Sequence, residues 1–195
     1  MPGYAYGLPA KDCIVGSTLA KIPGSVCHGC YALRGNYRFP SVKNVQQRRL
    51  DSLGHPQWSE AMIAIIHGLK IKWFRWHDSG DLQGPAHLAR IAKIAEACPK
   101  TRFWLPTREK IFVYSHRRQV GEFPKNLVVR VSGTMIDGPA PVGFSNTSTV
   151  TTGTPTCPAP KQNNECGDCR RCWASSSRYA LTSSRRDMVT DSGQA

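Results

Sequence analysis

The sequence has 195 residues, of which 40% are hydrophobic, and 26 Lys and Arg residues against 13 Asp and Glu residues give a formal net charge of +13. This composition excludes an intrinsically disordered chain and predicts one domain with a sizeable core. Since there is neither a long apolar run nor a leader-like start, we expect a cytoplasmic protein with no membrane span. The charge favours nucleic acid as a partner, and because the basic residues are scattered, a solvated basic surface is the alternative.

The N-terminal part begins with a loop-like stretch that contains Cys13, Cys27 and Cys30 among glycine and proline residues. Further along, residues 56–70 read PQWSEAMIAIIHGLK and have the apolar spacing of an amphipathic helix. We therefore expect the three cysteines to lie in a loop that precedes the first clear βα unit.

Alternating strand and helix signals occupy the middle of the chain. Strands are predicted at 73–78, 102–107 and 126–132, where aromatic and β-branched residues are concentrated. Helices are predicted between them, at 84–98 and 108–120, from apolar residues at helical spacing. Because the strands recur about every 25 to 30 residues, the length of a β-helix-β crossover, they should be parallel neighbours in one α/β sheet.

The composition changes after the third predicted strand. Residues 134–165 are rich in Thr, Pro, Gly and Ser and contain one further strand signal, near 143–150. We predict a βα core at 1–133, a Cys-rich, irregular extension at 134–175 packed on the same domain, and a flexible tail at 176–195.

Polar residues follow each of the three predicted strands. Ligands of parallel sheets bind at the carboxyl ends of the strands, so these residues should line one edge and form a binding site there. Capping of the following helices is the alternative, above all for the two serines. The candidate cofactor-binding residues are Asp78, Ser79, Gly80, Asp81, Thr107, Arg108 and Ser132.

Eight cysteines in a sequence with βα patterning favour metal ligation over disulfides. A [4Fe–4S] cluster with one iron open to another ligand is held by three thiols, and Cys13, Cys27 and Cys30 could supply them. A structural zinc ion would need a fourth ligand, which His28 could supply. Cys98 stands just before a predicted strand, so we expect it at the opposite, amino edge of the sheet as a buried structural thiol.

The second cysteine group lies within CPAPKQNNECGDCRRC and consists of Cys157, Cys166, Cys169 and Cys172. Its CxxCxxC core resembles ferredoxin spacing, which predicts a second iron–sulfur cluster. Four thiolates also make an ordinary structural zinc site, so zinc is the alternative metal.

Several stretches of the sequence resemble one phage family. PGYAYGLPA, GSVCHGCYALRGNY, FRWHDSGDLQ, FWLPTRE, NLVVRVSG and CGDCRRCW are similar to the gene product 88 family. More distantly, the CxxCYA motif and the strands that end in SGD and PTR are similar to phage proteins that resemble radical S-adenosylmethionine (SAM) enzymes. The usual radical SAM signature is CxxxCxxC, whereas thirteen residues separate Cys13 from Cys27 here.

This resemblance implies a full or partial (β/α) barrel and roles for the matching residues. The three N-terminal cysteines would hold the cluster, and its open iron would bind the methionine part of SAM. The turn at 78–81 would accept hydrogen bonds from the SAM amino group. Arg108 would meet a carboxylate or a phosphate, and Ser132 would contact the ribose.

Two functions of different classes follow. The first is an iron–sulfur enzyme of the radical SAM type that acts on a nucleic-acid component or a small metabolite, in the host cytoplasm. The second is a non-catalytic phage protein, stabilised by iron–sulfur or zinc, that binds nucleic acid. An iron–sulfur enzyme would be brown and a zinc protein colourless, while no residue pattern identifies the substrate.

Overall fold

The structure is a computed structural model that describes residues 1–175 and 178–182. Its strands form one sheet, in which every neighbouring pair is parallel and the spatial order follows the sequence order. The strands are β1 (Tyr4–Tyr6), β2 (Trp73–Trp76), β3 (Arg102–Thr107), β4 (Leu127–Ile136), β5 (Thr147–Thr151) and β6 (Arg178–Thr182). Such a sheet winds in one direction, as a (β/α) barrel does, which confirms the predicted α/β fold with a partial-barrel-like parallel sheet.

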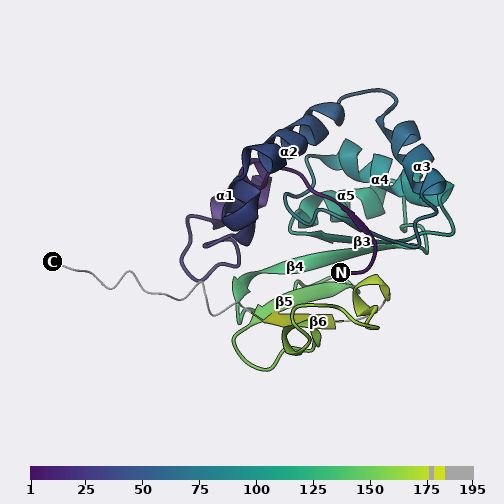
Figure 1. Cartoon of the computed structure of the whole chain (residues 1–195). Coiled ribbons are helices and arrows are strands. Elements are labelled where there is room, and N and C mark those ends of the chain that lie inside the picture. The colour runs from purple at the N-terminus through teal and green to yellow at the C-terminus, as the bar shows by residue number, and fades with distance from the viewer. Residues whose placement is uncertain (176–177, 183–195) are drawn as a thin grey trace.

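Helices cover one face of the sheet, and the irregular segment between β5 and β6 lies on the other (Figure 1). The helices are α1 (Ile14–Leu19), α2 (Pro40–Ser52), α3 (Trp58–Gly68), α4 (Pro85–Ala97) and α5 (Lys110–Gln119). The predicted helices at 56–70, 84–98 and 108–120 correspond to α3, α4 and α5. None of the helices in the described residues combines the length and the apolar character that a membrane crossing requires.

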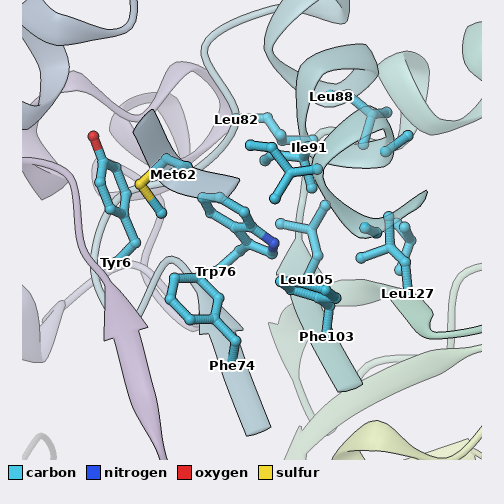
Figure 2. Close-up of a cluster of buried hydrophobic side chains, with 14 of the residues drawn as sticks. Tyr6, Met62, Phe74, Trp76, Leu82, Leu88, Ile91, Phe103, Leu105 and Leu127 are labelled. Atoms are coloured by element: carbon cyan, nitrogen blue, oxygen red, sulfur yellow. The ribbon is translucent and has the colours of Figure 1, made fainter. Parts of the chain in front are cut away.

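The main core lies between the sheet and these helices because alternate strand residues point to opposite faces. Trp76 of β2 and Phe103 and Leu105 of β3 are buried on the helix side, where they pack in one cluster with Leu88 and Ile91 of α4 (Figure 2). Each such side chain contributes about 1.5 to 3 kcal/mol when it leaves water. This core fixes the positions of the strand ends and therefore of the residues that follow them.

The opposite face of the sheet, which we call the inner face, carries its own aromatic cluster. Trp73 and Trp104, which alternate with the core residues of β2 and β3, contact Trp173 with ring centres 5.5 and 5.4 Å apart. The indole Nε1 of Trp173 donates a hydrogen bond to the carbonyl oxygen of Phe74, at 3.0 Å. The Cys-rich segment is therefore anchored on the inner face of the sheet.

Four helices and strands were not predicted, and α1 is one of them, because the sequence indicated a loop around Cys13. Strand β1 has three residues, too few for a period to appear, and it pairs with β2 through Tyr4 and Phe74. Helix α2 is rich in polar residues, so its apolar stripe is weak. Strand β6 pairs with β5 inside the segment that the sequence assigned to a flexible tail, and the rest of that tail, residues 176–177 and 183–195, lies outside the described residues.

Candidate functional site

The N-terminal cysteine loop follows β1 directly and crosses the carboxyl edge of the sheet. Its middle is tied to the end of β4, because the amide of Val26 donates to the carbonyl of Thr134 at 3.0 Å and the amide of Ile136 donates to Gly24 at 2.9 Å. Since β2 and β3 lie between β1 and β4, the loop passes over their carboxyl ends. The polar residues of the predicted site lie at these ends.

The loop brings the thiols of Cys13 and Cys27 together. A Cβ placed on Gly16 would lie 3.4 Å from the sulfur of Cys13 and 3.8 Å from that of Cys27, and it would collide with the Cys13 Cβ at 2.7 Å. Cys30 is held close by a turn in which its amide donates to the carbonyl of Cys27, at 3.2 Å. Gly16 therefore allows the backbone to pack against Cys13 more closely than any other residue would.

Burial raises the pKa of the Cys13 thiol to about 12, and the neighbouring Asp81 carboxylate and the other two thiols act in the same direction. Burial also raises the pKa of Cys27, against the opposing effect of the Arg108 guanidinium. Both thiols are therefore protonated near neutral pH in the metal-free chain. A metal centre would have to displace these protons, so its binding should weaken as the pH falls.

The carboxylate of Asp81 joins the ends of β2 and β3. Its Oδ1 accepts hydrogen bonds from the Thr107 hydroxyl at 2.6 Å and from the Leu82 amide at 2.8 Å, and its Oδ2 accepts one from the Arg108 amide at 2.8 Å. Burial raises the pKa of Asp81, and these three donors oppose that effect. These hydrogen bonds hold Asp81 and Thr107 in position across the two strand ends.

Arg108 retains hydrogen-bonding capacity at this site. Its Nε is buried and has no hydrogen-bond partner within the described part of the chain. Its charge acts on Cys13, Cys27 and Asp81, which places the guanidinium beside the thiols. A buried cation with an unused donor fits an anionic ligand, such as a carboxylate.

Glu109 holds the start of the cysteine helix, and the sequence analysis did not include it in the site. Its Oε1 accepts a hydrogen bond from the amide of Val15, at 2.8 Å, and the side chain is buried. Cys13 is the N-cap residue of α1, so this bond fixes the first turn of the helix and with it the cysteine. Glu109 follows β3 by two residues, but its partner Val15 is distant in sequence, so nothing in the sequence pattern indicated this contact.

The turn at 78–81 packs against the chain that leaves β1. The hydroxyl of Ser79 donates to the carbonyl of Leu8 at 2.9 Å and accepts a hydrogen bond from Gln46 of α2 at 2.7 Å. Gly80 has a φ of +76°, and a Cβ there would lie 2.6 Å from the Cβ of Leu8. The turn therefore connects β1, β2 and α2. Ser79 does not cap a helix, which was the alternative role considered for it.

Two tyrosines that the sequence analysis left out of the site contact Asp78. The hydroxyl of Tyr31, the residue after Cys30, donates to the Asp78 carbonyl, and the hydroxyl of Tyr37 donates to Asp78 Oδ2 at 3.2 Å. Burial raises the pKa of Tyr37, and the Asp78 carboxylate adds to this effect. Asp78 thus connects the cysteine loop to the end of β2.

Ser132 lies inside a strand, whereas Cys98 lies between a helix and a strand. Ser132 lies within β4, whose strand continues to Ile136, so it cannot cap a helix; its hydroxyl is 2.9 Å from that of Ser148 on β5. Cys98 is buried directly after α4 and before β3, at the amino edge of the sheet. The predicted location of Cys98, away from the candidate site, is confirmed.

The C-terminal cysteines lie on the inner face, in the Cys-rich segment. Cys172 is buried with Trp104 and Trp173, and Cys157 packs against the same cluster. In residues 1–175 and 178–182, no three His, Cys, Asp or Glu side chains meet closely enough to hold a single metal ion. A zinc ion would need its thiolates about 2.3 Å from one point, and a [4Fe–4S] cluster would need one thiolate at each ligated iron.

Fold and site together define a class: parallel α/β proteins wound in sequence order, with a cysteine-bearing loop after the first strand. The chain belongs to the Gene product 88 family, whose sequence profile matches residues 1–175, which confirms the family resemblance of the sequence. Neither the curated proteins nor the solved structures include a significant match to this chain.

Proposed function

We propose that this protein is an iron–sulfur enzyme of the radical SAM type that works in the host cytoplasm. Cys13, Cys27 and Cys30 hold a [4Fe–4S] cluster, and SAM binds at its open iron. One observation carries the proposal: the loop after the first strand of a sequentially wound parallel sheet carries the three cysteines to the edge where Asp81 and Arg108 lie. In (β/α) barrels this edge carries the catalytic groups.

The thiol count supports an open position. Three cysteines bind three of the four irons, so the fourth is free for an exogenous ligand. Cys13 and Cys27 both lie next to Gly16, which supports binding of one cluster by both sulfurs. Arg108, with its unused Nε donor, supports binding of the SAM carboxylate.

When bound, such a cluster would supply the electron for reductive cleavage of SAM. The residues of the chain orient the ligands and exclude water. Asp81 and Glu109 hold the ends of β2 and β3 and the start of α1 in place. The cysteine loop covers this edge, so the reaction would take place beneath it, shielded from solvent.

Arg75 supports an anionic substrate, such as a nucleic-acid component with a phosphate. It lies on the inner face of β2, with its guanidinium carbon 4.6 Å from the centre of the Trp104 ring. Its Nε is buried without a hydrogen-bond partner within the described residues. A guanidinium stacked on an aromatic ring and holding an unused donor suits a phosphate oxygen.

The proposal is tested by incubating anaerobically prepared protein with SAM and dithionite and measuring 5′-deoxyadenosine by chromatography. We expect 5′-deoxyadenosine to form only when iron, sulfide and reductant are all present. Protein that carries iron and sulfide but produces none above the protein-free control would contradict the SAM assignment.

A matched pair of variants at the two ends of β3, Arg102 and the residue after Thr107, tests the role of Arg108. Arg108→Gln should weaken SAM binding roughly ten- to hundredfold, because it removes one charge-assisted hydrogen bond, and should leave the iron content unchanged. Arg102→Gln alters an exposed arginine at the other end of the same strand and should change neither quantity. Equal SAM affinity in the two variants would show that Arg108 does not contact SAM.

Binding of nucleic acid without catalysis is the second candidate, and the net charge of +13 is the observation that favours it. In that case zinc or iron–sulfur only stabilises the fold. The affinity for single- and double-stranded oligonucleotides should then fall steeply with salt, because binding releases counterions. Micromolar binding at 50 mM salt by a colourless, zinc-containing preparation would favour this function over the enzyme.

A further inference from the structure

The Cys-rich segment between β5 and β6 has almost no hydrophobic core of its own. In residues 152–175 the regular structure consists of two short 3-10 turns, and the only buried side chains are those of Cys172 and Trp173. A stretch of this length with so little apolar burial does not offset the entropy cost of ordering it. An additional cross-link is therefore required to keep it folded.

The cysteines are among the less exposed residues of this segment. Cys172 is buried and Cys157, Cys166 and Cys169 are partly buried, whereas residues 160–165 between them are exposed. Four partly or fully buried cysteines in a segment with little hydrophobic core resemble a small metal-binding domain.

Hydrogen bonds bring the two arms of the segment together. The Arg171 guanidinium donates to the carbonyl of Thr156 at 3.3 Å, which places the residues next to Cys172 and Cys157 side by side. Both cysteines pack in the cluster of Trp104 and Trp173. On the other side of the loop, the Cys169 amide donates to the Cys166 carbonyl at 2.9 Å.

Positive charges surround the segment. Buried Arg130 on β4 donates to the carbonyls of Arg171 and Ala174, at 3.2 and 3.0 Å. These carbonyls lie before and after Cys172 in the sequence. The Arg170 guanidinium donates to the carbonyls of Gly167 and Cys169, at 2.5 and 2.9 Å. These hydrogen bonds therefore hold the backbone around Cys169 and Cys172 in place.

From this arrangement we infer that Cys157, Cys166, Cys169 and Cys172 bind a second, fully ligated [4Fe–4S] cluster that fastens the segment to the inner face of the sheet. The spacing favours a cluster over zinc. Structural zinc sites are typically built from two separate cysteine pairs, whereas here a CxxCxxC run is joined by one remote Cys-Pro, the ligand types of bacterial ferredoxins. With four thiols, this cluster has no open iron.

The experiment uses the full chain with Cys13, Cys27 and Cys30 all changed to Ala, so that the first cluster cannot form. Iron, acid-labile sulfide and zinc are measured after anaerobic reconstitution, with Mössbauer spectroscopy to identify the cluster type. We expect about four iron and four sulfide per chain. The further change Cys166→Ala with Cys169→Ala should remove both, and Cys98→Ala, the control outside both groups, should remove neither.

One zinc per chain without sulfide, or no bound metal, would overturn the inference. If the triple variant does not fold, the same comparison is made between the wild type and Cys166→Ala/Cys169→Ala, and an equal iron content in the two would overturn it. The inference is separable from the proposed function. Iron that is equal in the wild type and the triple variant would refute the first cluster and leave the second in place.

Proteolysis provides a second readout. Lys161, Arg170 and Arg171 are trypsin sites within the segment. With the cluster in place they should resist cleavage, and chelation of the iron should make them accessible within minutes. Equal cleavage before and after chelation would contradict a role of the cluster in holding the segment.

Discussion

The two cysteine regions of this protein are held by different forces. The N-terminal loop depends on buried polar groups at the strand ends, with Asp81 accepting three hydrogen bonds and Glu109 fixing the start of α1. The C-terminal segment depends on aromatic packing against Trp104 and on Arg130. The first region contains three thiols and the second contains four.

This difference indicates different roles on one scaffold. A network of buried polar groups places side chains accurately but loses stability when one member is removed, and it leaves Arg108 with an unused donor. Aromatic packing tolerates more variation, because it does not depend on the direction of individual hydrogen bonds. We therefore expect the first region to react with small molecules and the second to have a structural role.

The largest effect should come from the ligands of the first region. Cys27→Ala with Cys30→Ala leaves one thiol, so the variant should lose about four iron per chain and all 5′-deoxyadenosine formation. Cys98→Ala is the control, because this thiol lies at the opposite edge of the sheet. Iron analysis after anaerobic reconstitution decides the matter, and an unchanged iron content would refute the ligand assignment.

The next effect concerns the polar network. Asp81→Ala leaves buried donors of Thr107, Leu82 and Arg108 without an acceptor, so the free energy of unfolding should fall by about 3 to 5 kcal/mol. Asp51→Ala, at an exposed position on α2, should change it by less than about 0.5 kcal/mol. Urea unfolding measures both, and similar midpoints for the two variants would contradict the account.

Acid should destabilise the first region through two buried histidines beneath the 78–81 turn. His77 and His87 lie with ring centres 5.3 Å apart, and burial lowers the pKa of both, that of His87 to about 4. The folded protein binds fewer protons than the unfolded chain below pH 6.5, so stability is full above that pH and decreases as the pH falls. His87 alone should lower the free energy of unfolding by about 2 to 3 kcal/mol at pH 4.

Unfolding measured from pH 7 to 4 tests this dependence. His87→Gln should reduce the slope of stability against pH, whereas His55→Gln, at an exposed position, should preserve it. An identical slope in the wild type and His87→Gln would rule out the buried histidine as its source.

The smallest effect belongs to the thiol outside both regions. Cys98→Ala should lower the free energy of unfolding by about 1 to 2 kcal/mol, because it leaves a small void in the core between α4 and β3. Its iron content should equal that of the wild type. Loss of iron in this variant would show that the assignment of cysteines to the two edges of the sheet is wrong.

The regular part of the fold could be predicted from the sequence because its periodicity is strong. The aromatic and β-branched runs indicated β2, β3 and β4, and the spacing between them indicated parallel pairing. β1 and β6 could not be found in this way, because each is short and is stabilised by pairing with a neighbouring strand and not by its own pattern.

The candidate site was predictable in position but not in detail. Asp81 and Arg108 could be assigned to the site because residues that follow parallel strands lie at the same edge of the sheet. It could not show that Asp81 is occupied by protein donors, since this depends on how the loops fold back on each other. Glu109 and Tyr37 were missed for the same reason: their partners Val15 and Asp78 are distant in sequence.

The central claim, that Cys13, Cys27 and Cys30 hold a cluster with an iron open to SAM, is tested most directly by EPR spectroscopy of the dithionite-reduced protein with and without excess SAM. SAM that binds the open iron changes the electronic environment of the cluster, so the account predicts a shift in the g values of its signal. Arg108→Gln should require a roughly ten- to hundredfold higher SAM concentration for the same shift. An identical spectrum with and without SAM, in protein shown by analysis to carry the iron, would contradict the claim.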